Sequence, residues 1–218
     1  MNLSREVFFE LERRLKNAGL DSDAETFDVI KERLSSPMPV DADGFAAHAI
    51  YVILAGGFSQ KTAKNKHSEI VKYIKKAGNL ANTDDLLKIF NNKNKMAAIL
   101  KIWQNRYTYR DEYYKLSDWD SKLSYLAALP HIGKITANHL ARNLGENVVK
   151  YDIWIQRLGC AFAGRDELKS KIDNGKLGPD VKSACDEMFS HLERETGLPR
   201  GYVDVVLFRA CQNGLIKL

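Results

Sequence analysis

The chain has few cysteines, and their spacing excludes the common metal centres that are built from thiolates. Its three cysteines, Cys160, Cys185 and Cys211, lie 25 and 26 residues apart, and no Cys-x-x-Cys pair occurs. Zinc fingers and iron–sulfur clusters need closely spaced thiolates, so the sequence signals neither. A sparse and odd set of cysteines is typical of a reducing compartment, where we expect three buried, unpaired thiols.

Long apolar runs are also absent. No stretch approaches the roughly 20 apolar residues that span a bilayer, and the opening residues Met1–Glu6 contain no apolar segment of the secretory kind. We therefore expect a soluble intracellular protein of the cytoplasm or nucleoid, or of the nucleus in a eukaryote, with no membrane partner. The net charge of +5 is a mild excess, which fits a nucleic-acid partner without requiring one.

Alternating polar and apolar runs rich in Val, Ile and Thr are missing as well, so the sequence predicts no strand. Apolar residues instead recur at three- and four-residue steps, which is typical of helices. This spacing predicts helices at 3–18, 24–34, 44–55, 60–77, 83–89, 94–106, 119–128, 135–144, 153–163, 179–195 and 200–213. At 218 residues we expect a single all-α unit spanning 1–218, with a lobe at 45–150 and a second lobe from 1–44 plus 151–218.

A sharp turn is predicted at 129–137, which reads Leu-Pro-His-Ile-Gly-Lys-Ile-Thr-Ala. Pro130 fixes its own φ, and Gly133 tolerates backbone angles that other residues avoid. The first N–H groups of the following helix lack intrahelical partners and attract an anion, such as a DNA phosphate. Lys134 adds positive charge there. The alternative is an ordinary corner between two packed helices.

A single acid follows this turn. Asp152 lies 19 residues after Gly133 and immediately precedes the predicted helix 153–163. Asp is a common N-cap, so a purely structural role is one interpretation. A carboxylate at the mouth of a cleft also stabilises positive charge or orients water, and this role is compatible with capping.

The segment from Leu129 to Arg157 resembles the helix-hairpin-helix DNA glycosylases, the superfamily of endonuclease III and of the adenine-mismatch, 8-oxoguanine and alkyladenine glycosylases. Those proteins carry a Leu-Pro-Gly-Val-Gly hairpin followed by a catalytic Asp, which Asp152 matches, with Arg157 five residues later. Weaker similarity occurs at 59–62 (Ser-Gln-Lys-Thr) and 94–97 (Asn-Lys-Met-Ala). The resemblance covers about residues 45–160.

The resemblance implies an all-α, two-lobed helical bundle of the endonuclease III type, without the iron–sulfur cluster. It implies a monomer that binds double-stranded DNA, flips out a damaged or modified base and hydrolyses its N-glycosidic bond. Asp152 would stabilise the oxocarbenium-like sugar or orient the water. DNA contacts are implied for His131, Gly133, Lys134, Ile135, Thr136, Arg157, and for Gln60 and Lys61 as the wedge beside the flipped nucleotide.

The resemblance further implies a monovalent cation, Na⁺ or K⁺, on the backbone carbonyls of Ala127, Leu129 and Ile132. No other cofactor is expected to be required.

Ile135 stands where the bifunctional relatives have a nucleophilic lysine. A Schiff base needs an amine, and the amine of Lys134 points about 100° away on the helix. The chain is therefore expected to be a monofunctional glycosylase without lyase activity, with Lys150 as an alternative amine.

Two further positions depart from the family pattern. His131 replaces the first hairpin glycine and Trp154 replaces a histidine, each either as a packing or turn residue or as a DNA contact.

Two other functions stay open. The first is a related enzyme that acts on hypermodified bases, including those of viral DNA. The second is a non-catalytic DNA-binding relative that keeps the hairpin as a clamp. The lysines of 60–77 either follow a DNA backbone or form a solvated helix face.

Overall fold

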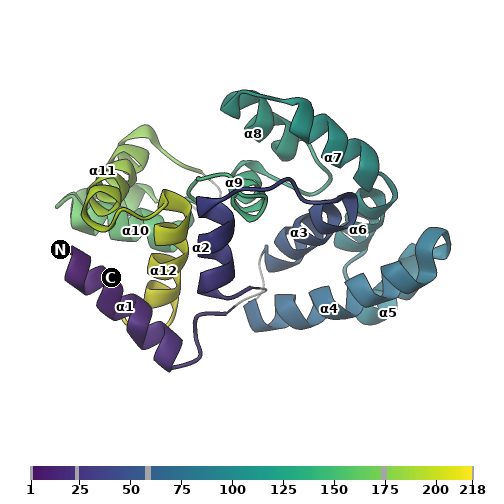
Figure 1. The fold of residues 1–218 in the computed structure, drawn as a ribbon, viewed down its shortest axis with the longest axis horizontal. Coiled ribbons are helices and arrows are strands. Elements are labelled where there is room, and N and C mark those ends of the chain that lie inside the picture. Colours follow the sequence, from purple (N-terminus) through teal and green to yellow (C-terminus); the bar gives the residue numbers. More distant parts are fainter. Residues whose placement is uncertain (1, 23–24, 57–59, 173–175, 218) are drawn as a thin grey trace. The chain divides into compact units, whose positions relative to one another are not determined.

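Helices make up the regular structure of the chain, which confirms the all-α prediction (Figure 1). The computed structural model describes residues 2–22, 25–56, 60–172 and 176–217. An isolated β-bridge pairs Ser22 with Thr26. The helices are α1 (Arg5–Asn17), α2 (Phe27–Ser35), α3 (Ala42–Ala55), α4 (Gln60–Ala77), η1 (Gly78–Leu80), α5 (Thr83–Ile89), α6 (Lys93–Gln104), α7 (Arg106–Lys115), α8 (Trp119–Ala127), α9 (Lys134–Asn143), α10 (Ile153–Phe162), η2 (Asp166–Lys171), α11 (Pro179–Thr196) and α12 (Arg200–Gln212).

Side-chain caps set where many of these helices begin. A Ser, Thr, Asp or Asn at the N-cap accepts a backbone N–H of the first turn, and so satisfies a donor that the helix leaves open. The capping residues are Ser4, Thr26, Asp41, Asn82, Asn92, Asp118 and Asp152. The predicted helices therefore start within three residues of the observed ones.

The helix α7 was not predicted from the sequence. Its segment reads Arg-Tyr-Thr-Tyr-Arg-Asp-Glu-Tyr-Tyr-Lys, its N-cap Asn105 makes no side-chain capping bond, and Tyr113 is the single buried residue recorded for it. A helix that buries one residue leaves no apolar stripe in its sequence.

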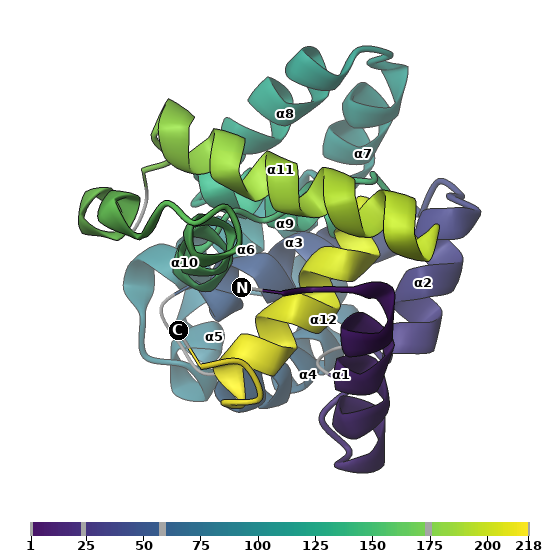
Figure 2. The same ribbon diagram turned by 90° about the vertical axis from the view of Figure 1, so that its left-hand side faces the viewer.

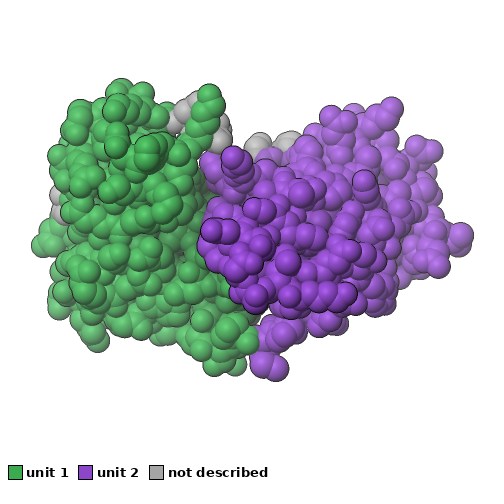
Figure 3. Space-filling view, turned by 90° about the horizontal axis from the view of Figure 1, so that it is seen from above, with its two compact units in different colours: residues 1–37, 145–218 green, residues 38–144 purple. Residues whose placement is uncertain are grey.

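The chain divides into two compact units, coloured separately in Figure 3. Unit 2 comprises Met38–Leu144, and unit 1 comprises Met1–Pro37 with Gly145–Leu218. The corresponding boundaries expected from the sequence were 45–150 and 1–44 plus 151–218. Breaking the chain at 37/38 and 144/145 assigns α3 to α9 to unit 2.

Helix α3 is the centre of unit 2 and packs against α4, α6, α7 and α9. Its residues Phe45, Ala46, Ala49 and Ile50 are fully buried. A helix that is apolar on most sides belongs inside a core, and the Ala residues leave room for neighbouring helices.

Helix α12 has the same role in unit 1, where it packs against α1, α2, α10 and α11 (Figure 2). Its Tyr202 is fully buried and donates a hydrogen bond of 2.6 Å to the carboxylate of Glu12 in α1. The burial of a hydroxyl is tolerated because it is paired.

Gly159 allows α10 and α11 to approach closely. A Cβ at this position would lie 2.7 Å from Sγ and 2.8 Å from Cα of Cys185, so no larger residue fits without a shift of the backbone. Cys160, Cys185 and Cys211 are all buried and free, as expected. None of the described helices is long and apolar enough to cross a membrane.

Candidate functional site

The predicted hairpin lies in unit 2 between α8 and α9, which pack against each other. Leu129 and Ile132 are buried, and the N–H of Ile132 donates to the carbonyl of Leu129 at 3.1 Å. The two buried side chains fix the turn to the core of unit 2, while His131 and Gly133 between and after them are exposed.

His131 occupies the tip of this turn with a φ of 62°, the one positive φ at a non-glycine position in the described chain. The left-handed region costs an L-residue roughly 1–2 kcal/mol. The turn therefore keeps the backbone shape that a glycine would adopt freely. The His131 side chain is exposed, and partial burial of its ring together with the charge of Lys95 lowers its pKa.

Thr136 closes the start of α9. Its Oγ1 accepts the N–H of Gly133 at 2.7 Å and donates to the carbonyl of Gly133 at 3.0 Å. The N–H of Gly133 is thus engaged within the protein. Helix geometry leaves the N–H groups of Lys134, Ile135 and Thr136 without intrahelical acceptors, and these three are the ones that can receive an anion.

Side chains around these amides differ in exposure. Lys134 is exposed, whereas Ile135 and Thr136 are half-buried. An exposed ammonium beside free amides and the positive end of the helix dipole favours a phosphate. Ile135 is half-buried and apolar. It occupies the position at which the resemblance to bifunctional glycosylases would place a lysine.

The candidate acid lies in unit 1, where Asp152 is the N-cap of α10. Its Oδ1 accepts the N–H groups of Trp154 at 3.0 Å and Ile155 at 3.1 Å. Its Oδ2 lies 3.6 Å from Nζ of Lys150, and the side chain is 14% exposed. Capping is therefore a real role of Asp152, and it fixes one oxygen while the other faces an ammonium group.

Three residues of α12 lie beside the ion pair of Lys150 and Asp152, and the sequence did not point to them. The buried Asp204 accepts the backbone N–H of Lys150 at 3.2 Å, and Nζ of Lys150 lies 5.2 Å from the ring centre of Phe208. Burial and the nearby charge of Asp152 raise the pKa of Cys211 to about 12. Positions 204, 208 and 211 share one helix face, but no pattern in the sequence links that face to Asp152.

Trp154 lies in the first turn of α10, and Arg157 follows three residues later. Arg157 is exposed, with its Cζ 5.9 Å from the centre of the Trp154 ring. Trp154 is half-buried and packs against the core of unit 1. The stacked guanidinium keeps a positive charge at the surface near the start of α10.

The wedge predicted at Gln60 and Lys61 begins α4, but the side chains of both residues lie outside the described part, as does Ser59. The described Lys95 lies near this segment. Its Nζ donates to the carbonyls of Gly56 at 2.6 Å and Leu54 at 3.4 Å, and burial lowers its pKa. Lys95 thus closes the end of α3, directly before the segment at 57–59.

No group of three or more His, Cys, Asp or Glu side chains within the described ranges is arranged to hold a metal ion. The carbonyls of Ala127, Leu129 and Ile132 stay the candidates for a cation. The carbonyl of Leu129 accepts one N–H, and a carbonyl oxygen has a second lone pair available.

No family model matches the chain, and no curated protein matches its sequence. Its structure, however, is similar to solved structures over nearly the whole length. The 8-oxoguanine DNA glycosylase of Methanocaldococcus jannaschii aligns with a TM-score of 0.64 at 16% identity, covering 96% of this chain and 94% of that one. The 8-oxoguanine glycosylase/lyase of the same organism, in complex with a 15mer DNA containing 8-oxoguanine, aligns with 0.60 at 15% identity, covering 97% and 100%.

The 8-oxoguanine DNA glycosylase of Thermotoga maritima, Tm1821, aligns with a TM-score of 0.59 at 16% identity, covering 93% of this chain and 94% of that chain. At these identities the similarity defines the fold. The chain therefore has the all-α fold of these solved 8-oxoguanine DNA glycosylases, one of the kinds of protein that the segment 129–157 resembles.

Proposed function

We propose that this chain, which has the fold of the 8-oxoguanine DNA glycosylases, is itself a DNA glycosylase that hydrolyses the N-glycosidic bond of a damaged or modified base. The observation that carries this proposal is the Asp152 carboxylate. It stands at the start of α10 with Oδ1 fixed by two amides and Oδ2 beside Lys150. Capping uses Oδ1, so Oδ2 and the negative charge of the carboxylate are available to the proposed reaction.

The reaction needs the target base outside the helix, because the glycosidic bond is inaccessible in stacked DNA. As the bond lengthens, positive charge develops on the sugar, and the Asp152 carboxylate stabilises it or orients the attacking water. The departing base takes the bonding electron pair, the water supplies the hydroxyl at the sugar carbon, and the proton that the water loses ends on the released base. A single carboxylate suffices because the base itself is the leaving group.

Unstacking one base costs a few kcal/mol, and contacts to the phosphate backbone must offset this cost. The N–H groups that open α9, with Lys134 beside them, are proposed to bind one phosphate. Gly133 and Thr136 shape this turn through their mutual hydrogen bonds, while His131, Ile135 and Arg157 are proposed to lie against the DNA. A Na⁺ or K⁺ ion on the carbonyls of Ala127, Leu129 and Ile132 would add positive charge at the same turn.

We further propose that the enzyme is monofunctional. Ile135 is half-buried on α9 and has no amine, so it cannot form the Schiff base that a lyase requires. Water is then the nucleophile, and the product is an abasic site with an intact strand.

The test is a screen of purified protein against a panel of duplexes. The panel contains 8-oxoguanine, because the solved relatives are named for that base, together with uracil, hypoxanthine, 3-methyladenine and hypermodified pyrimidines. Released material is identified by mass spectrometry. A free base supports the proposal, whereas a new nucleoside in place of a free base indicates group transfer. DNA binding without any product across the panel would overturn it.

A further inference from the structure

The segment that leads to Asp152 is not itself helix or strand, and α12 holds it at two points: Asp204 accepts the N–H of Lys150, and Asn147 accepts the N–H of Gly201. Residues 146–151 lie between α9 and α10, and two short backbone bonds are recorded in them. One joins the N–H of Val148 to Glu146, and the other joins the N–H of Asp152 to the carbonyl of Lys150 at 2.5 Å. The second has the spacing of a three-residue γ-turn, with Tyr151 as its central residue.

Tyr151 is fixed at both of its polar groups. Its hydroxyl donates to Oδ1 of Asp186 at 2.5 Å, and its carbonyl accepts from Nε2 of Gln156 at 2.9 Å. Its ring lies 5.4 Å from Nζ of Lys182. The central residue of the turn is therefore attached to α11 through its side chain and to α10 through its backbone.

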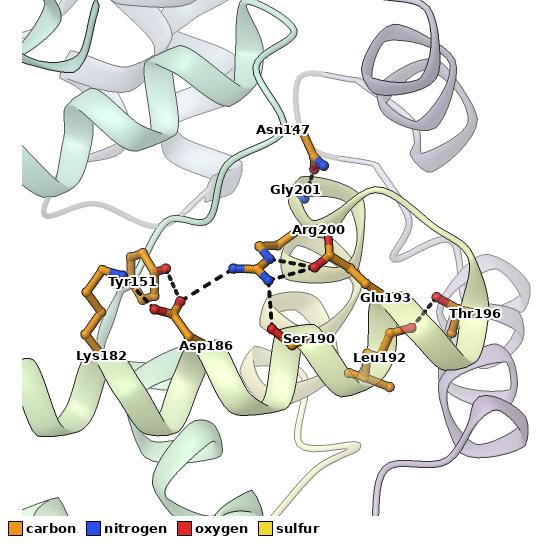
Figure 4. Close-up of polar contacts among 10 residues, drawn as sticks. All are labelled: Asn147, Tyr151, Lys182, Asp186, Ser190, Leu192, Glu193, Thr196, Arg200 and Gly201. Atoms are coloured by element: carbon orange, nitrogen blue, oxygen red, sulfur yellow. Dashed lines mark hydrogen bonds and ion pairs between the residues drawn. The ribbon is translucent and has the colours of Figure 1, made fainter. Parts of the chain in front are cut away.

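Asp186 is in turn held from two other sides (Figure 4). Nζ of Lys182 contacts its Oδ2 at 2.6 Å, and Nη1 of Arg200 lies 3.6 Å from its Oδ1. Arg200 also donates to Glu193 at 2.9 Å and to Ser190 at 3.0 Å. The carboxylate thus has little freedom to rotate away from the Tyr151 hydroxyl.

A hydrogen bond from a hydroxyl to a held carboxylate is among the stronger ones in proteins. Because Tyr151 precedes Asp152 directly, rotation at Tyr151 would move the carboxylate and its two capping bonds. A displacement of about 1 Å in a reacting group is enough to cost on the order of a hundredfold in rate.

From these contacts we propose that Asp186, acting through the hydroxyl of Tyr151, positions the Asp152 carboxylate for base excision. The inference rests on the proposed glycosylase function. Tyr151 and Asp186 are positioning residues in this scheme, because the bonds that hold them run within the protein.

The test uses four variants and the duplex on which the wild type is most active. Tyr151→Phe keeps the ring and removes the hydroxyl, and Asp186→Ala removes the acceptor. Each is expected to lower the single-turnover excision rate by on the order of tenfold or more, with the dissociation constant for DNA unchanged. The double variant should be no slower than Asp186→Ala, because that single substitution already removes the hydrogen bond that Tyr151→Phe removes. Asp186→Asn keeps an acceptor oxygen and should lie closer to the wild type than to Asp186→Ala.

Glu187→Gln is the matched control, since it neutralises the adjacent carboxylate of α11, whose partner is the exposed Arg165. It should react at the wild-type rate. Additive losses in the double variant, or a wild-type rate in Tyr151→Phe, would overturn the inference.

Hydrogen exchange at the amides of Trp154 and Ile155 provides a second readout that needs no substrate. Both amides donate to Asp152, so they should exchange faster in Tyr151→Phe and Asp186→Ala and not in Glu187→Gln. If the wild type releases no base from any duplex, the proposed function fails. Unchanged exchange at these two amides in Tyr151→Phe would separately refute the positioning role.

Discussion

Nζ of Lys150 lies 3.6 Å from Oδ2 of Asp152, and the other oxygen of that carboxylate accepts two backbone N–H groups. The two oxygens therefore have different roles: Oδ1 caps α10, and Oδ2 pairs with the ammonium group of Lys150. Substitutions can separate these roles, because capping needs an acceptor oxygen whereas the ion pair needs a negative charge.

Asp152→Asn should abolish base release while leaving DNA binding and stability close to the wild type. Asn is about as good an N-cap as Asp, so α10 should keep its start, but the negative charge is lost. Asp152→Ala should be equally inactive and should also lose about 1 kcal/mol of unfolding free energy. Single-turnover rates and urea unfolding measure the two effects, and excision at the wild-type rate by Asp152→Asn would refute catalysis by this residue.

Borohydride reduction should trap no covalent adduct between the wild type and DNA, because Ile135 has no amine to form a Schiff base. Ile135→Lys places an amine on α9 and is expected to yield an adduct. Electrophoresis under denaturing conditions detects the adduct. If the wild type is trapped, Lys150→Met tests whether the amine beside Asp152 forms the adduct. Loss of trapping in that variant would show that Lys150 is the nucleophile and would contradict the monofunctional mechanism.

His131→Gly should unfold at an equal or slightly higher urea concentration than the wild type. Relief of a left-handed φ gains roughly 1–2 kcal/mol, while the greater freedom of glycine in the unfolded chain costs about 0.5–1 kcal/mol. His131→Val should be clearly destabilised, since a β-branched residue is poorly suited to φ > 0. Lys101→Gly, on an exposed face of α6, is the control and should be destabilised.

Acid should weaken the fold partly through His67. Its Nε2 lies 2.9 Å from the carbonyl of Ala47, and burial lowers its pKa below the usual 6.5. The unfolded chain then takes up the proton first, so stability is constant above about pH 6.5 and falls as the pH drops towards the folded-state pKa. His67→Gln should show a smaller loss of unfolding free energy between about pH 7.5 and about pH 5.5. An identical loss in both proteins would contradict this origin.

Much of the fold could be predicted because apolar periodicity identifies the helices and capping residues mark where they begin. The predicted starts at 83 and 119 directly follow the observed N-caps Asn82 and Asp118, and the buried run at 44–55 belongs to the central α3. Helix α7 was missed because it has a single buried side chain, Tyr113, and one residue cannot produce a periodic apolar pattern in the sequence.

The residues of the candidate site could be predicted where they belong to a short sequence motif. They could not be predicted where they lie on helices that are distant in the sequence. Asp152 stood out because a hairpin and an N-cap signal lie close to it in the sequence. Asp204 and Asp186 lie 52 and 34 residues further along, and their roles arise from packing of α11 and α12 that no local pattern encodes.

Unit 1 is assembled from both ends of the chain, and this order has a consequence during synthesis. Helix α1 is synthesised well before Tyr202, the buried partner of its Glu12, because 190 residues separate the two. At about 5–20 residues per second, the apolar face formed by Phe8, Leu11 and Leu15 waits on the order of ten seconds for its partner helix. Unit 2 is contiguous and already synthesised by then, so a nascent chain stalled before Arg200 would carry a complete unit 2 and an α1 without its partner helix.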